Sequence, residues 1–409
     1  MLQLAVVSEH MRAPAAASGI AHAGALTGGL LGPIVFGQIV SALGYRPAWT
    51  RSPPWRCVAG PYCCMNDVAS SARWRLRVRK VADMTWAYRL DGPLRFTRHD
   101  VEMPSDDTLA DGQVLLRFLS GGICGSDIPR CMDGAGRSGP EPDGWSLHEI
   151  VGEVVATRSD MKVGSRVVGW VANTCGLREY VPTAATMLLE VPADLDDVHA
   201  APLQPLACVL HALSKLGDLS GARTAVIGLG PIGLLFSHAL KDGGASVVGV
   251  DRIDRSDVAT DFGLDQVVHS TSRTWAQAGD GDDGDDGFDV VVEAVGHQVG
   301  TMDDAIAVAA PGGTVLYFGN PDDDYYPIRF GTMMDRNLTL RAGRTPRDAR
   351  REALRVAADY IARYRGLLDR YVTHVLPVAE AQTAFDMASR PASGQLKIVL
   401  QNADRSGAA

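Results

Sequence analysis

The sequence predicts an α/β protein in which a doubly wound parallel sheet is combined with a separate β-rich domain. Three observations predict it: a strand, glycine turn, helix and strand at residues 223–251; strand patterns that alternate with helical patterns up to residue 345; and short strands separated by turns at residues 84–205. Alternating strands and helices are typical of parallel sheets, and runs of short strands are typical of all-β domains. A chain of 409 residues is long enough for two or three domains.

The unit at residues 223–251 organises the chain. An apolar run leads into Gly228-Leu229-Gly230-Pro231-Ile232-Gly233, a helical pattern follows, and a second apolar run ends on Asp251, 23 residues after Gly228. The first glycine permits a tight turn, the second lets the backbone approach a pyrophosphate, and the third lets helix and strand pack closely. The helix N-terminus adds free N–H groups and a positive dipole end. The unit therefore predicts a dinucleotide site that includes Gly228, Gly230, Ile232, Gly233 and Asp251.

Asp251 also indicates which dinucleotide is bound. A carboxylate at the end of the second strand accepts hydrogen bonds from the ribose hydroxyls of NAD and repels the 2′-phosphate of NADP. Arg252 and Arg255 follow closely and would attract that phosphate instead. We expect NAD as the cofactor, with Arg252 among the residues that bind it, and NADP remains the alternative.

Charge and cysteine content restrict the partners and the compartment. The net charge is −9, but residues 1–83 carry nine Arg and Lys against three acids, so residues 84–409 carry about −15. An acidic body argues against a nucleic-acid partner. Seven cysteines without regular spacing do not make a disulfide framework, and we expect a reducing, cytoplasmic setting.

The first 83 residues are unlike the remainder. Residues 13–45 carry no Asp, Glu, Lys or Arg, and residues 23–43 are long and apolar enough to span a bilayer. Together with residues 44–49 they resemble the last transmembrane segment of a major-facilitator transporter. We expect residues 1–83 to be a mostly disordered extension, either a start codon set too early or a fused remnant of a neighbouring gene, with Met84 as the working start. A membrane anchor and a single buried or interfacial helix are the alternatives.

The β-rich region at residues 84–205 contains candidate metal ligands. Cys124 and Ser126 lie in Gly-Gly-Ile-Cys-Gly-Ser-Asp, His148 and Glu149 begin 24 residues after Cys124, and Gln204 lies in Pro-Leu-Gln-Pro-Leu. Thiolate, imidazole and carboxylate are the ligands that zinc takes, and catalytic zinc keeps one position open. Bound zinc polarises a carbonyl or lowers the pKa of an alcohol.

These motifs and the glycine unit resemble the zinc-type medium-chain dehydrogenases/reductases, near their sorbitol and polyol dehydrogenase branch, over residues 84–402. In that family G-x-C-G-[ST]-D supplies a cysteine to zinc, G-H-E a histidine and sometimes its glutamate, and E-P-L a glutamate. The resemblance implies Cys124 and His148 as zinc ligands, Glu149 as a ligand or near-ligand, and Gln204 as a weak one. Cys124, His148 and Ser126 would form the catalytic site, with Ser126 passing the alcohol proton towards solvent.

The resemblance also implies the domain organisation. A GroES-like catalytic domain would cover residues 84–205 and be completed by residues 367–402, and a Rossmann NAD(P)-binding domain would cover residues 206–366. Ligands of such parallel sheets bind at the carboxyl ends of the strands. Further cofactor-binding residues implied there are Val295, Gly296, Phe318 and Gly319 beside the nicotinamide, and Lys397 near the pyrophosphate.

Two positions depart from the family pattern. Leu147 stands at the glycine of G-H-E, and Gln204 stands at the glutamate of E-P-L. A neutral amide binds zinc poorly and cannot act as a base, so Gln204 would alter the tuning of the metal. The four close cysteines of a structural zinc lobe are also missing, since only Cys175 lies between His148 and Tyr180. We therefore expect one catalytic zinc and no structural zinc.

The expected activity is that of an NAD(P)- and zinc-dependent alcohol dehydrogenase acting on CH–OH donors. It would interconvert a secondary alcohol, of polyol, sugar or cyclitol type, and a ketone by hydride transfer. A zinc-free quinone or enone reductase of the same superfamily and a non-catalytic nucleotide-binding protein are the alternatives. An edge strand near residues 314–318 would pair two copies into a homodimer, with a homotetramer as the alternative.

Overall fold

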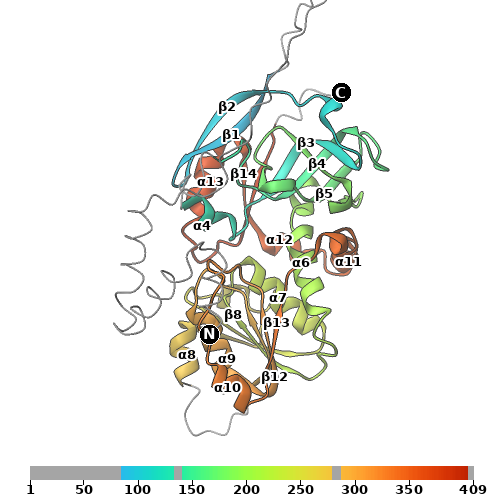
Figure 1. The fold of residues 1–409 in the computed structure, drawn as a ribbon. Helices are drawn as coiled ribbons and strands as arrows, with labels where there is room; N and C mark the ends of the chain where they lie inside the picture. The colour runs from blue at the N-terminus through green and yellow to red at the C-terminus, as the bar shows by residue number, and fades with distance from the viewer. Residues whose placement is uncertain (1–83, 133–140, 279–286, 404–409) are drawn as a thin grey trace, which may run out of the picture. The chain divides into compact units, whose positions relative to one another are not determined.

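The computed structural model describes residues 84–132, 141–278 and 287–403 (Figure 1). The extension expected at residues 1–83 lies outside the described residues. Within the described ranges, no helix combines the length and the hydropathy that crossing a bilayer requires.

The first sheet holds seven strands drawn from both ends of the described chain. Its order is β14-β15-β3-β4-β5-β7, and β6 pairs with the first half of β3. The pairings are antiparallel except for β14 with β15, and β1 and β2 form a separate antiparallel pair. The strands are β1 Met84–Gly92, β2 Arg95–Glu102, β3 Gln113–Gly122, β4 Glu149–Thr157, β5 Arg166–Trp170, β6 Tyr180–Ala184, β7 Leu188–Glu190, β14 Val372–Pro377 and β15 Lys397–Gln401.

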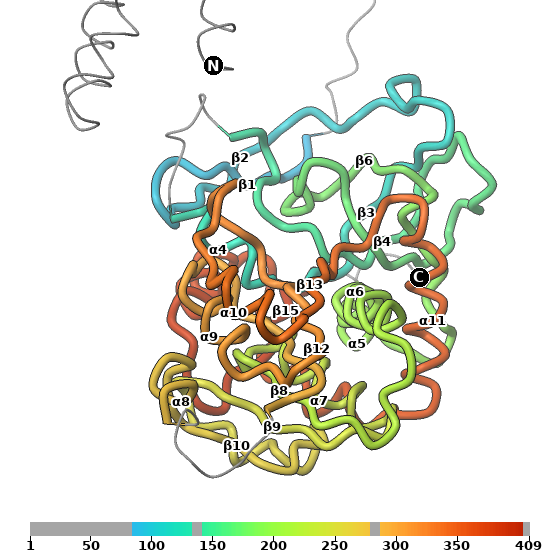
Figure 2. The backbone as a smooth tube through the Cα atoms, turned by 60° about the horizontal axis from the view of Figure 1, so that its bottom comes forward, coloured from blue at the N-terminus to red at the C-terminus, as the bar shows by residue number. Residues whose placement is uncertain are grey.

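The second sheet is parallel throughout and has six strands in the order β10-β9-β8-β11-β12-β13. Figure 2 shows β10 and β13 at its opposite ends. β8 and β11 are apolar and almost wholly buried, as expected for central strands covered on both faces. The strands are β8 Arg223–Ile227, β9 Ser246–Asp251, β10 Gln266–His269, β11 Phe288–Glu293, β12 Ala309–Tyr317 and β13 Thr339–Ala342.

Helices connect the strands and join the two sheets. The α-helices are α4 Asp127–Met132, α5 Asp197–Ala200, α6 Leu203–Leu213, α7 Pro231–Asp242, α8 Ser272–Ala278, α9 Gly300–Val308, α10 Phe330–Asp335, α11 Arg350–Arg363, α12 Gly366–Tyr371 and α13 Ala381–Ala388. Short 3-10 helices cover Asp106–Thr108, Ala172–Thr174, Ala185–Met187, Ser256–Val258, Arg347–Ala349 and Val378–Glu380. Pro231 begins α7 directly after the glycine turn, where its missing N–H is not needed.

One apolar core runs from the first sheet into the second. It includes Leu119 and Val168 of the first sheet, Val226 of the second, and Leu206 of α6 between them. α6 contacts β5, α7 and α11, so the helix links both sheets. Because this core is continuous, a site between the sheets has walls packed on a common interior.

The predicted fold class is confirmed: a GroES-like β-rich region accompanies a six-stranded parallel sheet of Rossmann type. The predicted edge strand was wrong. Residues 314–317 of that predicted strand belong to β12, which pairs with β11 on one side and β13 on the other. The true edge is β13, a strand that carries Arg341 and too few apolar residues to be detected from its pattern. The domain limits at residues 205 and 366 remain a prediction.

Candidate metal and cofactor site

Cys124, His148 and Glu149 form a cluster at the end of the first sheet. Each offers one ligand atom, and these atoms all lie within 4.8 Å of one another. The antiparallel pairing of β3 with β4 explains the cluster, because Gly122 at the end of β3 lies opposite Glu149 at the start of β4. Cys124 follows β3 by two residues and His148 directly precedes β4. The pairing of these two strands therefore brings together two residues that are 24 positions apart in the sequence.

Glycines at the end of β3 make room for this cluster. A Cβ at Gly122 would overlap the carboxylate of Glu149, and a Cβ at Gly121 would lie 2.6 Å from Cδ2 of Leu147. Leu147 is fully buried. The leucine at the family's glycine position is therefore accommodated by the missing side chain at Gly121.

Asp127 is the principal residue that the sequence interpretation missed. It is fully buried, and its Oδ1 lies 3.0 Å from Nδ1 of His148 and accepts a 2.8 Å hydrogen bond from Ser146. Its Oδ2 accepts from the backbone N–H of Cys124 at 3.1 Å. This carboxylate thus orients both predicted ligands and leaves Nε2 of His148 for the cluster, as carboxylates behind metal-bound histidines do. The signal was present, since Asp127 ends the same motif as Cys124.

The electrostatics of this pair favour positive charge on the imidazole. Burial lowers the pKa of His148, but Asp127 and Cys124 together raise it well above its usual value. Burial raises the pKa of Asp127, yet His148, Ser146 and the Cys124 N–H lower it overall. A cation at Nε2 would meet the same favourable field as the proton does.

Glu149 and Lys397 form a buried ion pair. The Lys397 ammonium lies 2.5 Å from Oε2 of Glu149 and donates to the carbonyl of Ile123 at 3.0 Å, and both side chains are almost inaccessible. Oε1 of Glu149 has no hydrogen-bond partner among the described residues. The Lys397 ammonium is therefore paired with Glu149, one of the three candidate metal ligands. Lys397 also lines the cavity described below.

The two other residues predicted for the metal site, Ser126 and Gln204, differ in their contact with the cluster. Ser126 donates a hydrogen bond to Sγ of Cys124 at 3.3 Å. Gln204 is buried in the first turn of α6, and the described hydrogen bonds do not join its side chain to the cluster. Burial raises the pKa of the Cys208 thiol, one turn further, to about 12. Cys208 therefore stays protonated and belongs to the interior.

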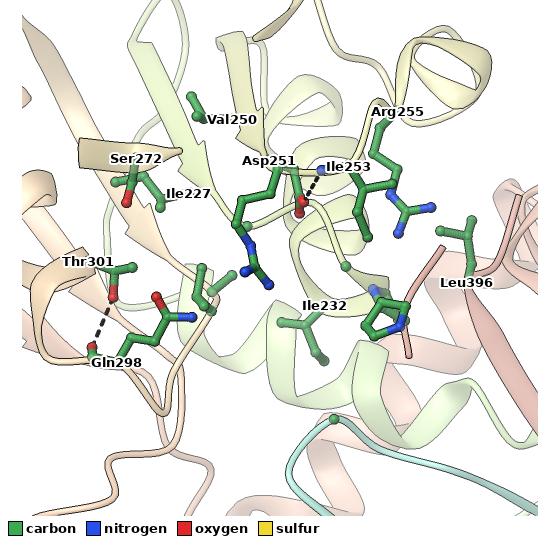
Figure 3. Close-up of a pocket in the computed structure, with 18 of the residues that line it drawn as sticks. Ile227, Ile232, Val250, Asp251, Ile253, Arg255, Ser272, Gln298, Thr301 and Leu396 are labelled. Atoms are coloured by element: carbon green, nitrogen blue, oxygen red, sulfur yellow. Dashed lines mark hydrogen bonds between the residues drawn. The ribbon is translucent and has the colours of Figure 1, made fainter. Parts of the chain in front are cut away.

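A cavity of about 580 Å³ is lined both by Cys124 of the metal cluster and by the glycine turn. This volume suits a small-molecule or cofactor site. Figure 3 shows Ile227, Ile232, Asp251, Gln298 and Leu396 among the residues around it. The predicted residues on its lining are Cys124, Gly228, Gly230, Ile232, Asp251, Arg252, Val295 and Lys397.

Four predicted cofactor residues do not line this cavity but pack beside it. A Cβ at Gly233 would overlap the carbonyl oxygen of Gly228, and one at Gly319 would overlap Gly296. The ring of Phe318 meets that of Phe236 edge-on at 4.9 Å. The three glycines let neighbouring backbone segments approach closely, and Phe318 packs in the interior.

Asp251 holds the glycine turn in place. Its Oδ2 accepts from the N–H of Leu229 at 2.6 Å. Its Oδ1 accepts from the N–H of Ile253 at 2.8 Å, a bond drawn in Figure 3. Each carboxylate oxygen retains a further lone pair for a ligand hydroxyl. Gly228 adopts φ +91°, and a Cβ there would lie 2.6 Å from Val295, so only glycine fits.

A nucleotide-type parallel sheet and a thiolate, imidazole and carboxylate cluster at one cavity define a metal-dependent, dinucleotide-linked dehydrogenase. Family models agree: residues 110–193 match an alcohol dehydrogenase GroES-like domain, and residues 231–362 match a zinc-binding dehydrogenase. The chain belongs to the zinc-binding medium-chain dehydrogenase family and is an NAD(P)-dependent dehydrogenase acting on CH–OH groups.

Two characterised relatives and one solved structure illustrate the similarity. The chain is 31% identical to D-altritol 5-dehydrogenase of Agrobacterium fabrum over 257 residues, 53% of this chain and 72% of the relative. It is 28% identical to D-arabinitol dehydrogenase 1 of Uromyces fabae over 346 residues, 76% of this chain and 95% of the relative. The fold matches alcohol dehydrogenase from Thermus sp. ATN1 with a TM-score of 0.66 and 24% identity, covering 77% of this chain and 99% of that one.

Proposed function

We propose that the protein interconverts a secondary alcohol of polyol, sugar or cyclitol type and its ketone, using one zinc ion and NAD. The observation that carries the proposal is that Cys124 of the metal cluster and Asp251 of the nucleotide unit line one cavity. The substrate class is supported by the relatives that act on D-altritol and D-arabinitol.

The cluster fits zinc by its donors. Cys124 offers a sulfur, His148 offers Nε2 because Asp127 occupies Nδ1, and Glu149 offers an oxygen without a hydrogen-bond partner. Three protein ligands with one open position are typical of catalytic zinc. When bound, the metal would supply Lewis-acid activation of the alcohol or carbonyl oxygen.

The chain's own residues would prepare the reaction. Asp127 fixes the orientation of His148, and Lys397 holds Glu149 through its buried ammonium. Ser126, beside Cys124, would accept the proton that leaves the substrate hydroxyl and pass it on towards solvent. Ile232 and Val295 present apolar surface to the cavity, which limits water beside the reacting carbon. Bound nicotinamide would exchange the hydride with that carbon.

The test measures zinc content and cofactor-linked oxidation in the same preparation. We expect one zinc per chain and reduction of NAD with a panel of polyols and cyclitols, lost with a strong chelator and restored by zinc. Simple primary alcohols should be poorer substrates. Zinc-free protein that reduces quinones or enones would contradict the proposal and favour the reductase alternative.

The cofactor preference follows from Asp251. We expect wild-type kcat/KM to be higher with NAD than with NADP, because the carboxylate meets the adenosine ribose and repels a 2′-phosphate. Asp251→Asn should lower the ratio of kcat/KM with NAD to kcat/KM with NADP by roughly tenfold, equivalent to about 1.4 kcal/mol. Arg252→Gln is the matched control, and it should widen the ratio. A wild-type preference for NADP would contradict this prediction and show that attraction of the 2′-phosphate by Arg252 and Arg255 outweighs its repulsion by Asp251.

We also propose a homodimer formed through β13. All four residues of this edge strand are exposed, and Leu340 is accompanied by the exposed Phe330 and Met334 of α10. An uncovered edge strand with apolar neighbours favours pairing with another strand. Leu340→Asp should yield monomers in sedimentation velocity, while Val163→Asp, at an exposed valine in a turn, should not. A wild-type monomer would contradict this assignment.

A further inference from the structure

Arg255 connects the nucleotide sheet to the segment that precedes the last strand. It follows β9 by four residues and is only 2% exposed. Its Nη1 donates to the carbonyl oxygens of Ala392 at 3.1 Å and Gln395 at 3.2 Å. Both acceptors lie between α13 and β15, so a side chain of one sheet region holds the backbone that leads into the other.

The charge of Arg255 is poorly compensated. Its partners are neutral carbonyls, no carboxylate of the described residues pairs with it within 4.0 Å, and its Nε has no hydrogen-bond partner among them. Burial lowers the pKa of the guanidinium, which Asp251 and Asp257 offset only in part. A buried charge without a counter-ion is unfavourable, so the site would gain from an anion.

The cavity lies beside this cation. Arg255 and Asp251 line it together with Gln395 and Leu396 of the held segment, and Figure 3 shows the Arg255 side chain directed towards Leu396. The next residue, Lys397, forms the ion pair with Glu149 of the metal cluster. Arg255 therefore stands at the start of a continuous set of contacts from the nucleotide unit to the metal ligands.

We propose that Arg255 is a positioning residue that responds to the diphosphate of the bound cofactor, which supplies the missing negative charge and fixes residues 391–396 against the nucleotide sheet. This rests on the proposed NAD-linked function. The segment then carries Lys397 to Glu149 in the same arrangement in each catalytic cycle. Adenosine, which lacks the diphosphate, gives no such gain.

The test compares ADP and adenosine binding to wild-type protein and to Arg255→Gln by calorimetry. ADP affinity should fall about 10- to 100-fold, as for a lost hydrogen bond to a charged group, and adenosine affinity should change less than about threefold. The KM for NAD should rise in parallel with the loss of ADP affinity. Arg255→Lys should restore much of the ADP affinity because it retains the charge.

Hydrogen exchange provides a second readout. ADP should protect the peptide that covers residues 389–397 in the wild type but not in Arg255→Gln. Arg370→Gln is the control. Arg370 pairs with Asp261, which also follows β9, but Arg370 does not line the cavity. If Arg255→Gln lost adenosine affinity and ADP affinity equally, or had a lower Tm with unchanged ADP affinity, this proposal alone would be overturned. A wild type that binds no ADP would overturn the proposed function as well.

Discussion

Cys124→Ser is expected to lose its zinc and to fall roughly a thousandfold in kcat/KM. Lewis-acid activation contributes several kcal/mol, and each 1.4 kcal/mol is about tenfold in rate. A serine hydroxyl cannot replace the cysteine sulfur, because a neutral oxygen is a weak zinc ligand. Neighbouring carboxylates cannot compensate, since Asp127 is bonded to the N–H of residue 124 and Glu149 is paired with Lys397. Zinc per chain and initial rates with NAD and a polyol measure the effect.

Cys175→Ser is the control for this variant. Cys175 lies near Leu147, where the two residues form a β-bridge, but it is not a member of the cluster. Its Sγ donates to the carbonyl of Asn173 at 3.2 Å, a bond that a serine hydroxyl can also make. This variant should keep both zinc and activity. Equal zinc loss from the two variants would show that the metal is held elsewhere.

Gly233→Ala is expected to destabilise the nucleotide sheet by about 3 kcal/mol or more, the upper range for forcing extra volume into a packed interior. The added Cβ would overlap the carbonyl oxygen of Gly228 and lie 2.9 Å from its carbonyl carbon. Backbone atoms cannot move aside as a flexible side chain would, so α7 must shift away from β8. Thermal unfolding and cofactor titration measure the loss.

Two neighbouring glycines separate stability from cofactor binding. Gly243→Ala meets no atom closer than 3.4 Å and should preserve both Tm and affinity. Gly230→Ala meets nothing within 4 Å but lines the cavity, so it should keep Tm and weaken cofactor binding. If Gly233→Ala retained wild-type Tm and affinity, the close approach of α7 to the turn would not be required.

The sequence predicted the parts of the fold that short-range patterns determine. The glycine turn, the strands on either side of it and Asp251 at the end of β9 were all found from apolar runs and spacing. β13 was missed because its four residues are exposed and only one of them, Leu340, is strongly apolar. Its place in the sheet depends on pairing with β12, which no local pattern records.

The candidate site was predictable only in its ligand types. Cys124, His148 and Glu149 stand in recognisable motifs, and the structure brings them together. Lys397 was not assigned its partner Glu149, because the sequence does not show which side chain the first residue of β15 meets. The contact of Arg255 with Gln395 joins segments 140 residues apart for the same reason.

The arrangement of the first sheet affects the order in which the two sheets can fold during synthesis. All six strands of the parallel sheet come from one stretch of the chain, whereas β14 and β15 follow that stretch and return to the first sheet. β15 pairs with Ser120–Gly122, the end of β3 that leads to Cys124, while β6 covers the earlier half. Since domains generally form as their residues emerge, the parallel sheet can fold during translation. The end of β3 that leads to Cys124 pairs with β15 only after all strands of the parallel sheet have been made, so the metal cluster should be completed late in folding.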